Sequence, residues 1–211
     1  MAKLVQIHIN QTDYDQLKSS RFNLCCALKV NDVYSVACLG TFDYLPSARF
    51  SWLPTYQVFG TNFFNAGAQA VVETNPVDID IGQRATMDAA GVLTAEDVGS
   101  SGVITFQNNY GPIHPGLIGT SAGPDGVQRQ LPIHVERDAA DTGFVWLTPV
   151  NVVQIWFQLG ATTAMMLSPD KTIPGTIVMH SISSIVEIDL THRDTASVQY
   201  QNGAWSTIAS N

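Results

Sequence analysis

Apolar side chains recur at every second position through much of this chain. The clearest example is residues 77–81, where apolar residues alternate strictly with two aspartates. A period of two places successive side chains on opposite faces of a β-strand, whereas a helix repeats every 3.6 residues. Gly and Pro divide residues 40–211 into short runs of this kind. The pattern therefore predicts an all-β protein with little helix.

About ten to twelve short strands are expected, enough for an antiparallel β-sandwich of the jelly-roll type or for a closed barrel. Folds of this kind and length are commonly one domain, so we expect a single all-β domain over residues 1–211. Residues 11–20 lack a β-branched run and predict a single helical turn or a loop, not a helix. Residues 88–101 are rich in Ala, Gly and acids and predict a surface connection.

An extended run over residues 50–58 contains Pro54, which lacks the N–H that a central strand donates. The run is therefore expected to be an edge strand or a bulged strand. Residues 77–81 are expected to bury Val77, Ile79 and Ile81 and to expose the two aspartates.

A hairpin with the two-residue loop Asn31-Asp32 is expected near the start of the chain. Counting outward from this loop places Cys25 opposite Cys38, in a position where the Cα atoms lie about 4.5 Å apart. A disulfide there would be strained. The odd number of cysteines, with Cys26 as the third, favours three reduced thiols.

The composition narrows the possible partners. Charged residues make up 13% of the chain, and 10 basic against 18 acidic residues give a net charge of −8. No segment gathers Lys and Arg with aromatics, so nucleic acid is not an expected partner. No window approaches the roughly 18 apolar residues of a transmembrane segment, and residues 1–10 do not resemble a signal peptide. These features predict a cytoplasmic protein, and its weakly charged surface favours a homo-oligomer.

Motifs for metal, cofactor or nucleophile chemistry are not found in the sequence. Residues 119–123 only approximate the G-x-S-x-G pattern, and the cysteines lack the spacing of a zinc site. The acidic pairs Asp78/Asp80 and Glu187/Asp189 are expected to lie on solvated strand faces, because a Ca²⁺ site needs more oxygen ligands. We therefore expect no metal, no cofactor and no assigned catalytic residue.

Three histidines leave acid–base chemistry open. His114 lies in a loop constrained by Gly and Pro, and His180 lies in an expected strand. His134 alternates with apolar neighbours and is expected to face solvent.

Aromatic residues supply the main indication of a binding site. Trp52 and Tyr56 share one face of the run over residues 50–58, and the constrained loop presents Asn109, Tyr110 and His114. An exposed aromatic ring with a polar neighbour suits sugars and other flat neutral molecules. These five residues are the predicted ligand-binding set. Of the other tryptophans, Trp156 is expected to pack in the core, and Trp146 and Trp205 lie in or next to strands.

Three functions remain open at this point. The first is a non-enzymatic, lectin-like or toxin-like β-sandwich that binds a glycan or a similar neutral ligand. The second is a self-assembling structural or pore-forming protein. The third is a cofactor-free enzyme that uses His114 or His180 as an acid or base.

Overall fold

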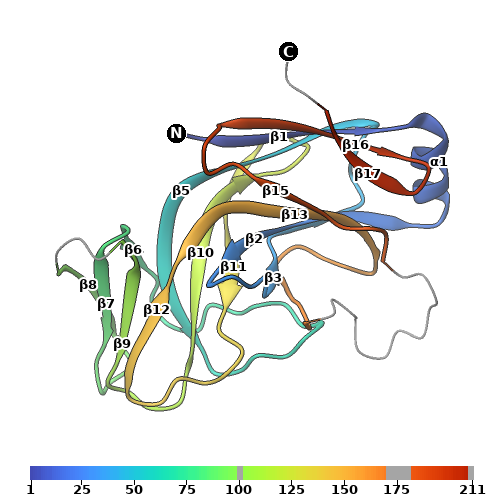
Figure 1. Ribbon diagram of the computed structural model, residues 1–211. Helices are drawn as coiled ribbons and strands as arrows, with labels where there is room; N and C mark the ends of the chain where they lie inside the picture. The colour runs from blue at the N-terminus through green and yellow to red at the C-terminus, as the bar shows by residue number, and fades with distance from the viewer. Residues whose placement is uncertain (99–101, 170–181, 209–211) are drawn as a thin grey trace.

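The computed structural model describes residues 1–98, 102–169 and 182–208, and within these ranges it contains one helix and seventeen strands (Figure 1). The helix is α1 (Gln11–Ser19). The strands in chain order are β1 (Lys3–Ile9), β2 (Phe22–Val30), β3 (Val36–Ala37), β4 (Leu39–Thr41), β5 (Ser47–Thr61), β6 (Val77–Ile79), β7 (Gln83–Met87), β8 (Leu93–Asp97), β9 (Ile104–Asn108), β10 (His114–Ala122), β11 (Gln128–Val135), β12 (Gly143–Leu147), β13 (Pro149–Leu159), β14 (Met165–Met166), β15 (Val186–Asp189), β16 (Thr195–Gln201) and β17 (Ala204–Ile208).

Two sheets form the main sandwich. A seven-stranded sheet has the order β11-β10-β5-β1-β16-β17, with β6 paired to β5, and a four-stranded sheet has the order β15-β13-β2-β4. Figure 1 shows β1, β5 and β16 as one layer above β13 and β2. Side chains of both layers, among them Ile7, Phe50, Leu24 and Ile155, belong to one buried cluster. The prediction of an all-β sandwich is confirmed, whereas the barrel alternative does not apply, because the described seven-stranded sheet ends at β11 and β17.

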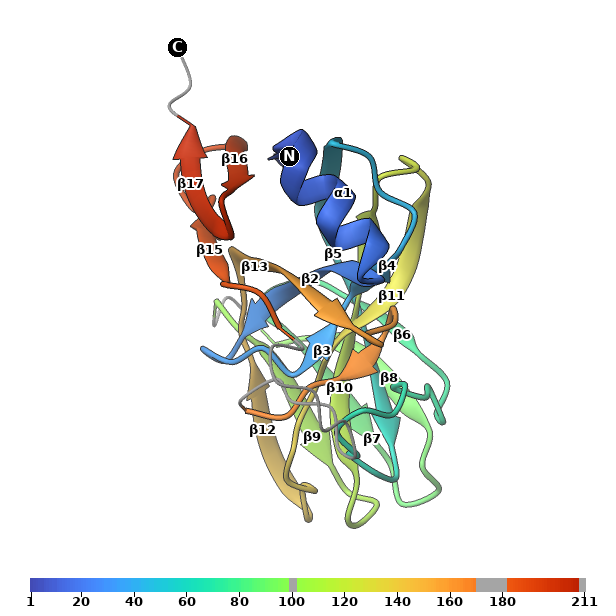
Figure 2. The same ribbon diagram turned by 90° about the vertical axis from the view of Figure 1, so that its right-hand side faces the viewer.

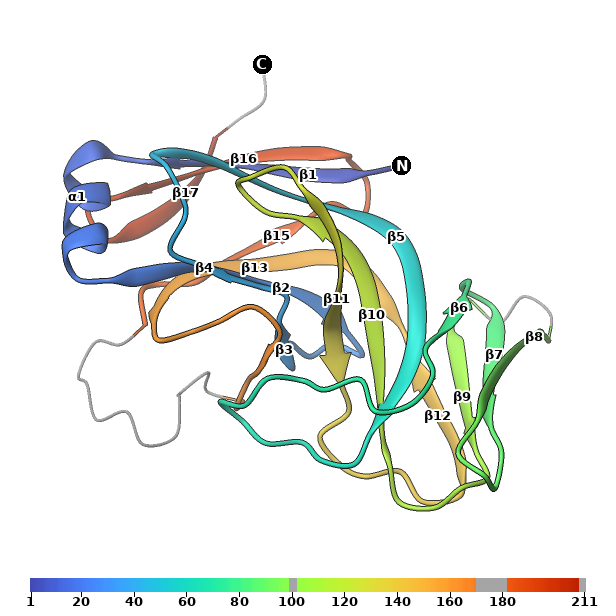
Figure 3. The same ribbon diagram turned by 180° about the vertical axis from the view of Figure 1, so that it is seen from behind.

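A third sheet, of order β12-β9-β7-β8, stands beside the lower part of β5 and β10 (Figures 1 and 3). Its inner face carries Met87, Ile104, Phe106 and Leu147, which are fully buried and belong to the same main core. Its outer face is turned away from the sandwich. The small sheet therefore covers one side of the main core with its inner face, and its outer face does not pack against the sandwich.

Two strand pairs in the described chain are parallel, whereas the sequence predicted antiparallel pairing. β1 pairs with β16, so the two ends of the chain lie side by side, and β7 pairs with β9. The number of strands among the described residues also exceeds the expected ten to twelve, and four of the strands have only two or three residues.

Residues 11–19 form a helix, so the expectation of a turn or loop was wrong. Asn10 begins the helix by accepting a hydrogen bond from Thr12 N at 3.0 Å. Leu17 is buried, and Tyr14 packs edge-on against Tyr44 at 5.9 Å between ring centroids. Tertiary contacts of two side chains thus stabilise a segment that has little apolar periodicity of its own. No helix in the described part of the chain is long and apolar enough to cross a bilayer.

Residues 88–101 were predicted to be a surface connection, but residues 93–97 form β8. The turn before this strand is closed by Asp88, whose carboxylate accepts from Ala90 N and Val92 N, and by Gly91 at φ 80°. Only Leu93 of β8 is buried, so the strand lacks the alternation by which it could be recognised.

The Asn31-Asp32 loop is as predicted, with both residues at positive φ, but the pairing beyond it is not. Cys25 lies opposite Gly40, two residues further along than expected. The second arm of the hairpin is broken into β3 and β4, and this irregularity shifts the register. Cys25 and Cys38 belong to different buried clusters, and all three cysteines are free.

β5 is continuous across Pro54, and the register of β10 against it shifts between Gly119 and Thr120, opposite this position. The predicted bulge is therefore present, but β5 lies inside the sheet and not at its edge. Ile81 was expected to be buried and is exposed, because β6 ends at Ile79.

Candidate functional site

The outer face of the small sheet presents two parallel rows of side chains that cross its four strands. Residues that are paired across strands point to the same face, so the register defines both rows. The first row is Trp146, Thr105, Arg84 and Glu96, and the second row is Phe144, Gln107, Thr86 and Thr94. We call these eight residues the outer-sheet face. The face has aromatic residues at one side and polar residues across the rest, and among the polar residues Thr105 is buried.

The aromatic side of this face is formed by the edge strand β12. Val145 and Leu147 point inward, which leaves Phe144 and Trp146 outward with 52% and 61% of their surface exposed. Both faces of β12 are thus apolar, although only one is buried. Neighbouring large aromatic residues at such exposure commonly mark a binding surface.

Arg84 occupies the centre of the face. Its Nη1 lies 3.5 Å from a Glu96 carboxylate oxygen and 3.4 Å from Gln107 Oε1, and its guanidinium lies 5.6 Å from the centre of the Phe144 ring. Arg84 Nε and Thr86 Oγ1 have no hydrogen-bond partner among the described residues and are covered by their neighbours. The two polar contacts of Arg84 are long, so its guanidinium is only weakly held by Glu96 and Gln107.

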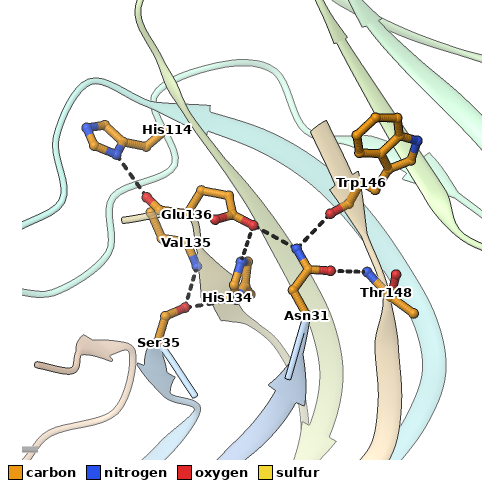
Figure 4. Close-up of polar contacts among 8 residues, drawn as sticks. All are labelled: Asn31, Ser35, His114, His134, Val135, Glu136, Trp146 and Thr148. Atoms are coloured by element: carbon orange, nitrogen blue, oxygen red, sulfur yellow. Dashed lines mark hydrogen bonds and ion pairs between the residues drawn. The ribbon is translucent and has the colours of Figure 1, made fainter. Parts of the chain in front are cut away.

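Asn31 fixes the backbone of β12 from the other side (Figure 4). Its Nδ2 donates to Trp146 O at 2.6 Å and to Glu136 Oε1 at 2.8 Å, and its Oδ1 accepts from Thr148 N at 2.8 Å. Figure 4 shows the Trp146 ring turned away from these contacts. The network therefore holds the Trp146 main chain and leaves its indole free.

A buried serine, histidine and glutamate continue this network. Ser35 Oγ lies 2.9 Å from His134 Nδ1, and His134 Nε2 lies 3.1 Å from Glu136 Oε1. Ser35 Oγ also accepts from Val135 N, so its hydroxyl proton is directed to Nδ1 and the Nε2–H donates to Glu136. The connectivity is that of an acyl-transfer triad, but Ser35 is 0% exposed. A substrate has no access to this hydroxyl, so we assign the network a structural role.

His134 is 1% exposed, so the expectation that it faces solvent was wrong. Burial acts to raise the pKa of Glu136, but hydrogen bonds from His134 and Asn31 and the nearby charge of Arg137 lower that pKa below its usual value. The carboxylate is therefore ionised at neutral pH and accepts both bonds.

The structure does not bring the five predicted ligand residues together. Trp52 is 2% exposed and packs against Phe50 at 5.7 Å between ring centroids. Tyr56 is buried as well, and burial raises its pKa to about 12. Both rings lie in the main core and offer little surface to a ligand.

The loop residues are placed differently. Asn109 and Tyr110 follow β9 at one end of the small sheet, where Asn108 Oδ1 accepts from Tyr110 N at 3.0 Å. Tyr110 is half exposed, and its ring lies beside Gly91 in the β7–β8 turn. His114 begins β10 and donates from Nδ1 to Glu136 O at 2.9 Å, so it fixes the end of β11. His180 lies outside the described residues.

Trp156 is fully buried, as predicted, and its Nε1 donates to Gln158 Oε1 at 2.7 Å. The predicted ligand residues did not include Trp146, Phe144, Arg84 or Thr86. The run from 143 to 147 has apolar residues at consecutive positions, so its alternation does not distinguish the exposed side from the buried one.

Several open hollows lie elsewhere on the surface, two of which contain charged residues that pair within the protein. One of about 480 Å³ lies between α1 and the β16–β17 turn, and its Asp13 already accepts from Asn202 N and Gly203 N. The other, of about 360 Å³, contains Asp125 and Arg129, which pair with each other at 2.6 Å. The charged groups of both hollows are thus engaged within the protein, and neither hollow contains neighbouring exposed aromatic rings such as Phe144 and Trp146.

The described residues contain no group of three or more His, Cys, Asp or Glu side chains that could hold a metal ion. Comparison with protein-family models, curated proteins and solved structures finds no match to this chain.

Proposed function

We propose that this protein is a non-enzymatic, lectin-like binding module that holds an uncharged glycan on its outer-sheet face. The observation that carries the proposal is the exposure of Trp146 and Phe144 side by side on an edge strand, next to a row of Thr, Gln and Arg side chains. Sugar rings have an apolar face that stacks on an aromatic plate and hydroxyls that pair with such polar groups.

The spacing of the rows supports a ligand of more than one sugar unit. Phe144 and Trp146 are two residues apart on one strand, so they are separated by about 7 Å. The main chain of β7, which carries Arg84 and Thr86, lies two strands from β12, at about 10 Å, although the Arg84 guanidinium reaches back toward the Phe144 ring. A ligand that contacts both must therefore cross the strands.

The charge on the face supports an uncharged ligand. Arg84 is paired with Glu96 at 3.5 Å, so neither sign dominates at the centre of the face. The net charge of −8 over the whole chain also opposes the approach of anionic glycans.

A glycan array followed by calorimetry on the best ligand tests the proposal. Trp146→Ala is expected to weaken binding about 30-fold, which corresponds to the roughly 2 kcal/mol of a central aromatic contact. Phe144→Ala is expected to weaken it about 10-fold. The matched control is Phe63→Ala, which removes an exposed aromatic ring from the loop between β5 and β6. Equal losses for Phe63→Ala and Trp146→Ala, or no glycan bound by the wild type, would refute the proposal.

We also propose a cytoplasmic location. Three fully buried free cysteines support it, because thiols persist in a reducing compartment. Fractionation of cells that produce the untagged chain tests this, and recovery from a secreted fraction would contradict it.

A further inference from the structure

β17 forms one end of the seven-stranded sheet and pairs only with β16 among the described strands. Figure 2 shows it at the outer margin of the molecule. The two strands are joined by the two-residue turn Asn202-Gly203, with both residues at positive φ, so Gln201 and Ala204 form the first hydrogen-bonded pair. Hydrogen-bonded pairs then recur at alternate positions. The N–H and C=O groups of Trp205 and Thr207 consequently point away from the sheet, toward solvent.

Other sheet edges in the described chain carry features that obstruct pairing. β11 contains Pro132, β8 contains Glu96 and Asp97, β15 contains Glu187 and Asp189, and the Trp146 carbonyl of β12 is occupied by Asn31. β17 has the sequence Ala-Trp-Ser-Thr-Ile, with no charge and no proline, and its pairing with β16 is regular. It is therefore a strand edge that is open to pairing with another chain.

We propose that β17 pairs in antiparallel fashion with β17 of a second copy of this chain, about a two-fold axis at Ser206. In this register Trp205 lies opposite Thr207 of the second copy, and Thr207 lies opposite Trp205. The outward groups of both residues then form four main-chain hydrogen bonds, and Ser206 faces its own copy in the intervening non-hydrogen-bonded position.

The edge itself favours a second copy over another partner. The register places each outward donor opposite an outward acceptor, so the strand is complementary to itself. A basic partner would select the acidic strands β8 and β15 instead. The β16–β17 hairpin contains no charged side chain, so no like charges meet where two copies of this edge pair. Since only five residues take part on each side, the dimer is weak and depends on concentration. Pairing of this kind does not depend on glycan binding.

Sedimentation equilibrium at moderate ionic strength tests the proposal, because salt screens the repulsion between two acidic copies. The wild type is expected to shift from monomer to dimer as its concentration rises. Thr207→Pro removes an outward N–H without breaking the pairing with β16, so it is expected to keep the fold and remain monomeric. A wild type that is monomeric at every concentration, or a Thr207→Pro variant that dimerises equally, would overturn the proposal.

Disulfide trapping tests the register. Ser206→Cys is expected to form a covalent dimer under mild oxidation, because the two Cα atoms lie about 4.5 Å apart in a non-hydrogen-bonded pair, at the short end of the range that a disulfide spans. The matched control is Thr207→Cys, whose two copies would lie more than about 7 Å apart and are expected to cross-link at least 10-fold more slowly. The three native cysteines are buried and do not interfere. Equal rates for the two variants would overturn the two-fold register.

Discussion

Asn31 Nδ2 donates to the carbonyl oxygen of Trp146 across 2.6 Å, so a hairpin loop near the start of the chain holds an edge strand more than a hundred residues later. The same amide nitrogen donates to Glu136 Oε1, the acceptor of the His134 bond. The buried network and the exposed aromatic side of the outer-sheet face are therefore parts of one hydrogen-bonded structure. A change in Asn31 should affect both stability and the ligand surface.

Asn31→Gly is expected to lower the free energy of unfolding by about 2–3 kcal/mol, because three hydrogen bonds of the side chain are lost at about 1 kcal/mol each. Glycine tolerates the φ of 50°, so this variant removes the side-chain hydrogen bonds without straining the backbone. Urea denaturation measures the loss. Asn31→Ala adds backbone strain and is expected to be less stable still. If Asn31→Gly were as stable as the wild type, the network would have no anchoring role.

Glu136→Gln is expected to reduce the acid sensitivity of the fold. The pKa of Glu136 is lowered in the folded protein, so its contribution is fully present above the unfolded value of about 4.3 and is lost as the pH falls through the folded value. The variant should be about 1–3 kcal/mol less stable than the wild type at pH 7, with the difference shrinking below pH 4. Urea denaturation as a function of pH measures this. The exposed Glu96→Gln variant serves as the control. If the stability difference between Glu136→Gln and the wild type were the same at all pH values, the lowered pKa of Glu136 would be contradicted.

The two-residue periodicity was sufficient to predict the class of fold, because alternation follows directly from which face of a strand is buried. It located the extended run over residues 50–58, most of the strand predicted at residues 77–81, and the loop at Asn31-Asp32. It failed for α1, whose stability comes from packing of Leu17 and Tyr14 and not from a periodic apolar face. It also failed for β8, where four of five residues are exposed.

The residues of the outer-sheet face were harder to predict from the sequence than the class of fold. Trp52 was selected because Pro54 suggested an edge strand, yet β5 accommodates the proline at an irregularity inside the sheet, and Trp52 is buried. Trp146 was not part of the predicted ligand set, and Val145 and Leu147 make its strand apolar on both faces, so alternation does not show which face is exposed. Which face is covered depends on the packing of the small sheet against β5 and β10, and periodicity along one strand carries no information about that packing.

The cysteines are expected to be unreactive in the native protein. Burial raises the pKa of Cys38 to about 12 and raises the pKa values of Cys25 and Cys26 as well, so the reactive thiolates are scarce at pH 8. A thiol reagent should detect no cysteine in the native protein and three after denaturation without reductant. The Ser206→Cys variant supplies a positive control with one rapidly reacting thiol. A count of one after denaturation would indicate a disulfide and would contradict the proposed reducing compartment.

Gly40→Ala is expected to be among the most destabilising single-methyl changes in the chain. A Cβ at this position would lie 2.6 Å from the backbone carbonyl carbon of Thr162, and a backbone atom cannot move aside as a side chain can. The displaced segment would also lose the bond from Gly40 N to Thr163 Oγ1, which is 3.1 Å long. We expect a loss of about 3 kcal/mol or more, at the upper end of the range for overpacked sites.

Gly119→Ala provides the comparison for this prediction. Its added methyl would meet only side-chain atoms of Ile133, the nearest at 3.0 Å, and these can shift by a rotamer adjustment. We expect a loss of about 1 kcal/mol for this variant. Thermal and urea unfolding of both proteins would measure the difference. If Gly40→Ala cost no more than Gly119→Ala, the turn at residues 162–164 would have to be more easily displaced from β4 than its contacts indicate.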